Sequence, residues 1–245
     1  MAKPLRQWLE EDVAAVRGKP MRWLSEHYFF RDPNRPVYAD TNFFFPPADG
    51  IVLYAKCVAP DEAIVDIKGR NFSLREAMRL PDFNQSALVV GIFMTFYDVH
   101  INRMPYAGRL SYRELATLGS SNLPMLQVEK ALLEELAPYT HNADYLFSNQ
   151  RVLNTITSLE LGQRYYVLQI ADYDVDCITP FRLAQNQVFA QNQRFSQIRY
   201  GSQVDLIIPL SARYDFTPLV EVGTHVEGCV DPLVRITPRT AGVAI

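Results

Sequence analysis

The chain has 245 residues, 48% of them hydrophobic, which allows one large domain with a substantial core. Its formal net charge is -3 and it has no long basic run, so a nucleic-acid partner is not expected. Three widely separated cysteines exclude a disulfide framework, and with no Cys-x-x-Cys pair and four histidines we expect no metal site.

The first forty residues predict a short helical segment. Apolar side chains recur at helical spacing, opposite a charged face, at Leu5, Trp8, Leu9, Val13 and Val16. The pattern ends at Gly18 and Pro20, and residues 21–30 form a second short pattern rich in aromatic side chains. These faces can pack on the rest of the protein or rest on a bilayer, and the mixed charges favour packing. We assign residues 1–40 to an N-terminal helical segment.

The N-terminal region has no apolar run of the length that a signal peptide or a transmembrane helix needs. Charged residues occur here instead, at Lys3, Arg6, Glu10, Glu11 and Asp12. We therefore expect a cytoplasmic protein, with peripheral contact to the cytoplasmic face of the membrane as the alternative location.

The middle of the chain is patterned mainly as β-strands. Residues 51–54 and 63–67 are predicted to pair as a hairpin. Residues 88–95 form a continuous apolar run, which is typical of a central strand. One helix is predicted with Pro124 in its first turn, and strands return over residues 151–156 and 165–171. The pattern predicts a mainly β (α+β) domain over residues 41–245.

Residues 218–229 have paired glycines around short apolar strands, and resemble the repeat unit of biotinyl and lipoyl carrier domains, a barrel-sandwich hybrid. Such carriers need an exposed lysine at a hairpin tip, and no lysine follows Lys130. A carrier role is therefore excluded, and we predict that this segment is a structural unit of a barrel-sandwich-hybrid-like β domain.

The chain is organised around Gly201-Ser202, which precedes a strand pattern. Val204, Leu206 and Ile208 alternate with two polar residues, as in a half-buried strand. Glycine adopts backbone angles that other residues resist, so this peptide can be held in a strained turn. A strained peptide next to a hydroxyl is a candidate for attack by that hydroxyl, although most Gly-Ser pairs are only turns.

Three stretches upstream of Gly201-Ser202 indicate that this pair is more than a turn. They are Phe-Pro-Pro-Ala-Asp-Gly at 45–50, Val-Asp-Ile-Lys-Gly at 65–69 and Phe-Tyr-Asp-Val-His-Ile-Asn-Arg-Met-Pro at 96–105. Together with Gly201-Ser202, in this order, they resemble the phosphatidylserine decarboxylase family over residues 29–236. The Asp-Val-His-x-Asn-Arg-x-Pro motif is similar to the family branch with a single histidine, because Arg103 stands where many members have a second one.

The resemblance implies a self-processing carboxy-lyase. Ser202 would attack the carbonyl of Gly201, and the later elimination and hydrolysis would convert Ser202 into a covalent pyruvoyl group, the pyruvate cofactor. The products would be a β chain of residues 1–201 and an α chain of residues 202–245 that remain associated. The pyruvoyl ketone would react with the substrate amine and accept the electrons released as carbon dioxide leaves.

The resemblance also implies catalytic roles for three residues. Ser202 is the nucleophile, and His100 is the acid or base, since an imidazole with a pKa near about 6.5 can take and give protons near neutrality. Which step His100 serves is left open. Asp49 would orient His100, as the third member of a protease triad does. Asp98 is an alternative, structural partner of His100.

Arginines are candidates for binding a substrate carboxylate or phosphate, since the guanidinium fork matches both: Arg103, Arg151 and Arg199. Residues 149–151 read Asn-Gln-Arg where the family usually has Asn-Glu-Arg. His27, His141 and His225 lack motif context and are predicted on the surface. Cys177 is predicted in the core.

We therefore expect decarboxylation of phosphatidylserine to phosphatidylethanolamine, a step of phospholipid biosynthesis. One alternative is a soluble amino-acid decarboxylase resembling the tryptophan-decarboxylating branch, which the lack of a visible hydrophobic anchor favours. Another is an unprocessed relative that only binds lipid, against which the presence of Ser202, His100 and Asp49 argues. A homodimer is compatible with the sequence.

Overall fold

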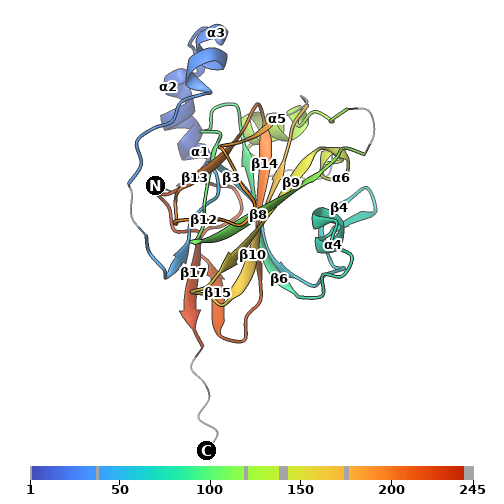
Figure 1. Cartoon of the computed structure of the whole chain (residues 1–245). Helices are drawn as coiled ribbons and strands as arrows, with labels where there is room; N and C mark the ends of the chain where they lie inside the picture. Colours follow the sequence, from blue (N-terminus) through green and yellow to red (C-terminus); the bar gives the residue numbers. More distant parts are fainter. Residues whose placement is uncertain (1, 37–38, 119–120, 138–142, 174–176, 240–245) are drawn as a thin grey trace, which may run out of the picture.

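The computed structural model describes residues 2–36, 39–118, 121–137, 143–173 and 177–239. Within them the main feature is a nine-stranded antiparallel sheet with β14 at its centre (Figure 1). Its strands, in spatial order, are β1 (Lys3–Pro4), β16 (Thr224–Val226), β3 (Gly50–Val58), β6 (Ala87–Met94), β14 (Ser202–Pro209), β10 (Gln163–Ile170), β9 (Arg151–Ser158), β8 (Gly108–Leu115) and β12 (Gln187–Phe189).

Smaller sheets complete the β structure of the described residues. One contains β11 (Ile178–Pro180), β13 (Arg194–Ile198) and β7 (Ile101–Arg103), and another contains β15 (Tyr214–Pro218), β17 (Val234–Pro238) and β2 (Phe43–Phe44). A two-stranded sheet pairs β4 (Ala63–Ile67) with β5 (Arg70–Ser73). The expected mainly β (α+β) fold is confirmed.

The helices are short and several lie near the N-terminus. They are α1 (Leu5–Trp8), continued through a π-helical turn (Leu9–Val13) into α2 (Ala14–Arg17), then α3 (Met21–Trp23) with a second π-helical turn (Leu24–Tyr28), α4 (Leu74–Met78), α5 (Leu126–Glu135) and α6 (Tyr145–Ser148). The predicted helix is α5, and its N-terminal cap is Met125, so Pro124 lies just before the helix and not in its first turn as predicted.

Most predicted strands are confirmed, including the central one, since β6 lies between β3 and β14 and all its residues are buried. The predicted hairpin of residues 51–54 with 63–67 is wrong. β3 pairs with β6, where Ile51 lies opposite Phe93 and Val58 opposite Ala87, while β4 pairs with β5. The long apolar run of β6 offers β3 a fully covered partner, which a short hairpin could not match.

The N-terminal segment is tied to the β-rich part of the chain. β1 extends the main sheet, with Lys3 opposite His225, and the backbone N–H of Leu5 donates to the carbonyl of Gly223 at 3.0 Å. Leu5, Trp8 and Val13 are buried, so the first helix packs on the domain as expected. In Figure 1 α2 and α3 extend beyond the sheet. Leu24 and Phe29, which follow them, are buried as well, so both ends of the segment pack on the domain.

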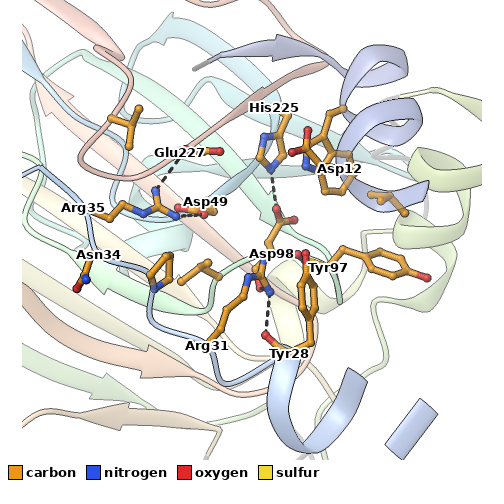
Figure 2. Close-up of a pocket in the computed structure, with 15 residues that line it drawn as sticks. Asp12, Tyr28, Arg31, Asn34, Arg35, Asp49, Tyr97, Asp98, His225 and Glu227 are labelled. Atoms are coloured by element: carbon orange, nitrogen blue, oxygen red, sulfur yellow. Dashed lines mark hydrogen bonds and ion pairs between the residues drawn. The ribbon is translucent and has the colours of Figure 1, made fainter. Parts of the chain in front are cut away.

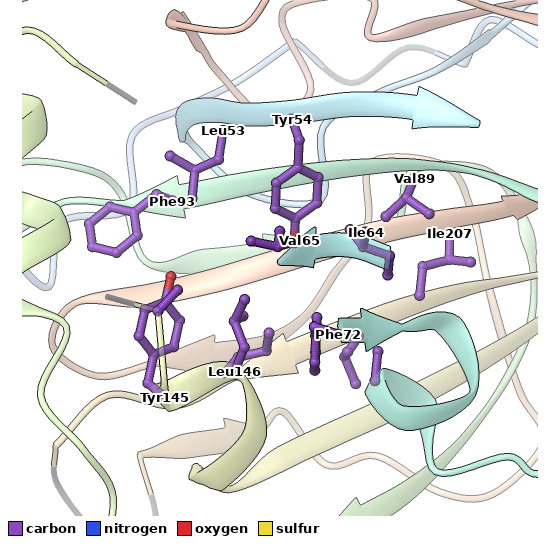
Figure 3. Packing of buried hydrophobic residues seen from close by; sticks show 14 of the residues in the cluster. Leu53, Tyr54, Ile64, Val65, Phe72, Val89, Phe93, Tyr145, Leu146 and Ile207 are labelled. Carbon is purple, nitrogen blue, oxygen red and sulfur yellow. The ribbon is translucent and has the colours of Figure 1, made fainter. Parts of the chain in front are cut away.

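The main sheet is covered on both faces, which corrects the expectation that residues 204–208 form a half-buried strand. Every residue of β14 is buried. Val204, Leu206 and Ile208 belong to one hydrophobic cluster and Ile207 belongs to the other. Figure 3 shows the cluster that contains Ile207, where Tyr54 and Phe93 of the sheet lie with Phe72 and Leu146 of the covering layer. A central strand between two packed layers has no solvent-facing side.

The polar residues of β14 are satisfied inside this core. The Tyr54 hydroxyl donates to Asp205, with its oxygen 2.8 Å from Oδ2, and Gln203 Nε2 donates to Asp205 Oδ1 at 2.8 Å. The Tyr145 hydroxyl donates to Gln203 Oε1 at 2.6 Å. Burial raises the pKa of Asp205 to about 6, although the Gln203 and Tyr54 hydrogen bonds oppose the shift. The network fixes the register of the strand that begins at Ser202.

This buried carboxyl predicts a pH-dependent stability. Because the pKa of Asp205 is higher in the folded chain, the folded state holds the proton more tightly, and stability should fall as pH rises from about 4 to about 6. A shift of about two units corresponds to about 3 kcal/mol. Asp205→Asn should remove this component, so urea unfolding between pH 4 and 8 should give a flatter profile than wild type. Glu10→Gln, at an exposed position, is the control; parallel profiles for Asp205→Asn and wild type would contradict the prediction.

Candidate active site

Ser202 is the first residue of β14 and has no exposed surface. Its hydroxyl donates to the backbone carbonyl of Tyr200, with 2.7 Å between the oxygens. The strained backbone expected at Gly201 falls one residue earlier, since Tyr200 has φ of 64°. A left-handed conformation is costly for a bulky residue, so the surrounding packing must hold the turn before the Gly201–Ser202 peptide.

Gly201 is required by a close approach. A Cβ added to this residue would lie 2.7 Å from Asp172 Oδ2 and 4.0 Å from Glu129 Oε2. Asp172 is itself fixed, because its Oδ1 accepts hydrogen bonds of 2.7 Å from the backbone of both Met125 and Tyr173. Burial raises the pKa of both the Asp172 and the Glu129 carboxyl groups. Sequence reasoning missed these two acids because they follow no motif.

His100 lies between β6 and β7 and is fully buried. Its Nδ1 lies 3.0 Å from the carbonyl oxygen of Asp98, so Nδ1 carries the proton and Nε2 keeps its lone pair. Nε2 has no hydrogen-bond partner. Burial lowers the pKa of His100 to about 4, with the charge and backbone carbonyl of Asp98 acting in the opposite direction. The site therefore holds a neutral imidazole with a free acceptor nitrogen.

His100 and Ser202 meet at the backbone of Tyr200. Ile198 N donates to the His100 carbonyl at 3.1 Å, so the segment leading to Ser202 runs alongside His100. The carbonyl of Tyr200 accepts the hydrogen bond from the Ser202 hydroxyl. The same backbone acts to raise the pKa of His100. The Phe29 ring packs on both residues, with centroids 4.1 Å from His100 and 5.7 Å from Tyr200. The two predicted residues share one neighbour, and no direct hydrogen bond joins them in the described structure.

Asp49 has other partners than the one expected. Arg35 Nη2 lies 2.5 Å from Asp49 Oδ2 (Figure 2). The backbone N–H of Gly228 donates to Oδ1 at 2.8 Å. Burial raises the pKa of Asp49 while the Arg35 guanidinium opposes the shift. Asp49 therefore links the segment before β3 to the segment after β16, and the hydrogen bond that orients His100 comes from Asp98.

Asp98, the alternative partner, contacts His100 through its backbone only. Its carboxylate receives a bond from His225 Nε2 at 2.6 Å, and bonds from the backbone and hydroxyl of Thr95 at 2.8 and 2.7 Å. Burial opposes ionisation, but His225 and Thr95 together hold the pKa of Asp98 below its usual value. Figure 2 shows His225 pointing at this carboxylate.

The predicted surface position of His225 is wrong. The side chain is buried, and its ring stacks on Trp8 with centroids 4.4 Å apart and planes 11° apart. Its hydrogen-bond partner, Asp98, is 127 residues away in sequence, so no local pattern predicts this contact. His27 is exposed and Cys177 is buried, as predicted, whereas His141 lies outside the described residues.

The three candidate arginines lie in different surroundings. Arg103 pairs with Asp32 at 3.0 Å and lines a cavity of about 510 Å³ with Arg35 and Arg194. Arg151 is buried in the core, where it donates to the Ala77 carbonyl at 3.0 Å at the end of α4, and burial lowers its pKa to about 10. Arg199 is exposed next to Tyr200. Of these three arginines, Arg103 is the one that lines this cavity.

A second cavity of about 290 Å³ lies between the N-terminal helix and the loop of Asp98 (Figure 2). Its walls carry both signs of charge, from Arg31, Arg35, Asp49, Asp98 and Glu227. Neither cavity reaches Ser202, which is fully buried together with His100. In the described structure the Gly201–Ser202 peptide is therefore buried.

The family model of phosphatidylserine decarboxylase matches residues 27–229, most of the chain. The chain belongs to the phosphatidylserine decarboxylase family. The expected family is therefore confirmed, and with it a decarboxylase; the single-histidine branch stays a prediction.

Relatives of the chain carry the same family name or a related one. It is 32% identical over 200 residues to the putative archaetidylserine decarboxylase proenzyme of Methanocaldococcus jannaschii, covering 81% of this chain and 84% of the relative. It is 29% identical over 245 residues to the phosphatidylserine decarboxylase proenzyme of Gluconacetobacter diazotrophicus, covering 93% and 90%. That of Nitratidesulfovibrio vulgaris is 27% identical over 229 residues, covering 94% and 85%.

Proposed function

We propose that the chain is a precursor that cleaves itself between Gly201 and Ser202, and then decarboxylates phosphatidylserine with a pyruvoyl group made from Ser202. The observation that carries this proposal is the buried, unpartnered Nε2 of His100 next to the backbone of Tyr200. Relatives of this chain are named as proenzymes, which supports maturation by processing.

The maturation can be written with its atoms balanced. Ser202 Oγ bonds to the Gly201 carbonyl carbon as the peptide C–N bond breaks, leaving an ester and a free amine. Loss of the Ser202 α-proton then expels the Gly201 carboxylate, and water releases ammonia and leaves the ketone of the pyruvoyl group. A neutral imidazole with a free Nε2 can accept the protons that these steps release. In the intact chain the hydroxyl bonds to Tyr200, so a rotation of Ser202 must precede the attack.

The residues around Ser202 fit a pyruvoyl group at this position. Ser202 sits at the start of a fully buried central strand, opposite Met94 of β6, so a ketone at this position would be held rigidly and away from bulk water. The pyruvoyl group supplies an electrophilic carbonyl that binds the substrate amine and accepts the electron pair released with carbon dioxide. His100 would hold or return a proton at Nε2.

The two chains would remain associated after cleavage. β14, which begins the α chain, is hydrogen-bonded on one side to β6 and on the other to β10, both in the β chain. Removing it would open the main sheet and expose its two hydrophobic clusters.

The names of the relatives support a serine-phosphodiester headgroup as the substrate, because phosphatidylserine and archaetidylserine share it. The product from phosphatidylserine would be phosphatidylethanolamine. Arg103 is the candidate for the acidic part of the substrate, since it lines the larger cavity three residues beyond His100.

The test is the intact mass of the purified wild-type protein under denaturing conditions, followed by an assay with phosphatidylserine and free serine. Two chains that meet at Gly201 and Ser202, the smaller one with a pyruvoyl N-terminus, are expected, with carbon dioxide released from the phospholipid. One unbroken chain that stays intact in the presence of phosphatidylserine vesicles would overturn the proposal. Release from free serine alone would replace the lipid by a soluble substrate.

Gly201→Ala should slow self-cleavage by about 10- to 100-fold, because the new methyl group would press on the fixed carboxylate of Asp172 and shift the scissile peptide. A time course of intact mass after synthesis measures the rate. Asp172→Ala in the same chain should restore much of it, as it removes the clash. If Gly201→Ala cleaves at the wild-type rate, the close approach has no part in the reaction.

A lipid substrate requires contact with a bilayer. In the part of the chain that is described, none of the helices has the length and apolar character needed to cross a membrane. Large apolar side chains are exposed on the second N-terminal helical stretch, at Met21 and Trp23, and on the turn after it, at Phe30. We propose that this stretch makes peripheral contact with the cytoplasmic face of the membrane.

Wild-type protein should co-sediment with vesicles of anionic phospholipid at low salt, and the double variant Met21→Ser/Trp23→Ser should lose most of this binding because two exposed apolar anchors are removed. Leu159→Ser, at an exposed apolar position on the turn after β9, is the matched control. Equal sedimentation of all three proteins would show that this stretch is not the contact.

A further inference from the structure

A continuous series of contacts joins the N-terminal helix to His100. The Trp8 ring stacks on His225, His225 Nε2 bonds to Asp98 Oδ1 at 2.6 Å, and the carbonyl of Asp98 accepts the hydrogen bond from His100 Nδ1 at 3.0 Å. All four side chains are buried. One residue, Asp98, therefore meets His225 through its carboxylate and His100 through its backbone.

The turn that carries Asp98 is held from several sides. Its carboxylate accepts the backbone N–H of Thr95, and its own N–H donates to the Thr95 carbonyl at 3.0 Å. Arg31 donates to the carbonyl of the neighbouring Tyr97 at 2.6 Å. Within this arrangement His225 is the partner that comes from a distant strand, so it fixes the turn relative to the main sheet.

His225 is seated by the N-terminal segment in two ways. Its backbone pairs with Lys3 across β1 and β16, and its ring lies against Trp8 of α1. Both contacts come from residues before position 27, where the match to the family model begins. These two contacts therefore come from outside the part of the chain that the family model covers, while the backbone of His225 also pairs with Ile51 of β3 inside it.

We propose that His225, seated by Trp8, is a positioning residue for His100. By holding Asp98, it fixes the carbonyl that accepts the hydrogen bond from Nδ1–H of His100, and so keeps Nε2 unprotonated beside the backbone of Tyr200. This inference rests on the proposed role of His100 as the base of self-cleavage. If so, the N-terminal helix helps to position His100, because Trp8 holds the ring of His225.

The tautomer of His100 separates positioning from a purely structural role. A His225–Asp98 hydrogen bond that only adds stability could be removed without changing which nitrogen of His100 carries the proton. If His225 positions the Asp98 carbonyl, removing the His225 side chain should break the hydrogen bond from His100 Nδ1 to that carbonyl. Both tautomers of His100 should then be populated. The chain has four histidines, so their ring nitrogens can be assigned with single variants such as His27→Gln.

The variants are His225→Leu, which fills similar space without a donor, and His225→Gln, whose amide can still donate to Asp98. Val13→Ala, at another buried position of the same helical stretch, is the control for loss of packing. Ring nitrogen spectra are recorded in a Ser202→Ala background so that the chain stays whole. Cleavage rates are measured from intact mass in the chain that keeps Ser202.

We expect a single Nδ1–H tautomer of His100 in the parent and the His225→Gln chain. We expect mixed tautomers in His225→Leu, with cleavage slowed by about 10- to 100-fold. Val13→Ala should change neither. A His225→Leu chain that keeps the single tautomer, or that cleaves at the wild-type rate, would overturn the proposal. Should His225→Leu fail to fold, Trp8→Leu is measured in its place and must show the same mixing of tautomers.

If the wild-type chain itself does not cleave, the proposed maturation fails. The tautomer spectra still decide whether His225 positions His100.

Discussion

Ser202→Ala should yield a single uncut chain with no decarboxylase activity. The hydroxyl is the only atom group of this residue that can attack the Gly201 carbonyl, and the ketone would be built from the carbons of the same residue. The loss should therefore be complete. Intact mass and carbon dioxide release measure the two effects separately.

Folding should be unaffected by this change, because Ser202 contributes one hydrogen bond, to Tyr200. Ser158→Ala is a suitable control, since it also removes a buried hydroxyl, at the end of β9 and far along the chain from the scissile bond. It should cleave normally. A cleaved or active Ser202→Ala protein would refute the assignment of the scissile bond.

His100→Gln should slow self-cleavage by about 100-fold or more, in line with the usual contribution of a positioned base. Glutamine nearly fills the space of the imidazole but cannot accept a proton at neutral pH. His27→Gln, at an exposed position, should leave the rate unchanged. A wild-type rate in His100→Gln would remove His100 from the reaction.

The pH dependence of the self-cleavage rate is a second test of the role of His100. Burial lowers the pKa of His100 to about 4, and the base is the neutral form, which is present above that value. The rate of self-cleavage should therefore be level from about pH 5 to 8 and fall as pH drops through about 4. A rate that falls near pH 6.5 instead would mean that the imidazole is solvated during the reaction.

Much of the site could be predicted from sequence because its signals are local. Gly201-Ser202 and the stretch containing His100 are short motifs, and the long apolar run of β6 marks the strand that leads to His100. The mainly β character follows from alternation and turn residues in the same way. Each of these depends on neighbours along the chain.

The errors have a common physical cause. The hairpin of residues 51–54 with 63–67 was predicted from proximity in sequence, but β6 offered β3 a longer covered partner. Polar residues of β14 suggested a solvent face, but Gln203 and Asp205 satisfy each other together with two tyrosines inside the core. Pairing and burial depend on partners that lie far away in sequence.

By itself the sequence determined the family, and it predicted the Gly201–Ser202 peptide and His100 as the site, because these signals are carried by contiguous residues. Only the tertiary structure decided the partners of those residues: Asp49 pairs with Arg35, His100 bonds to the backbone of Asp98, and His225 lies buried under Trp8. Hydrogen bonds, burial and the resulting pKa shifts arise between segments that meet only when the sheet closes, and no local pattern encodes which segments meet.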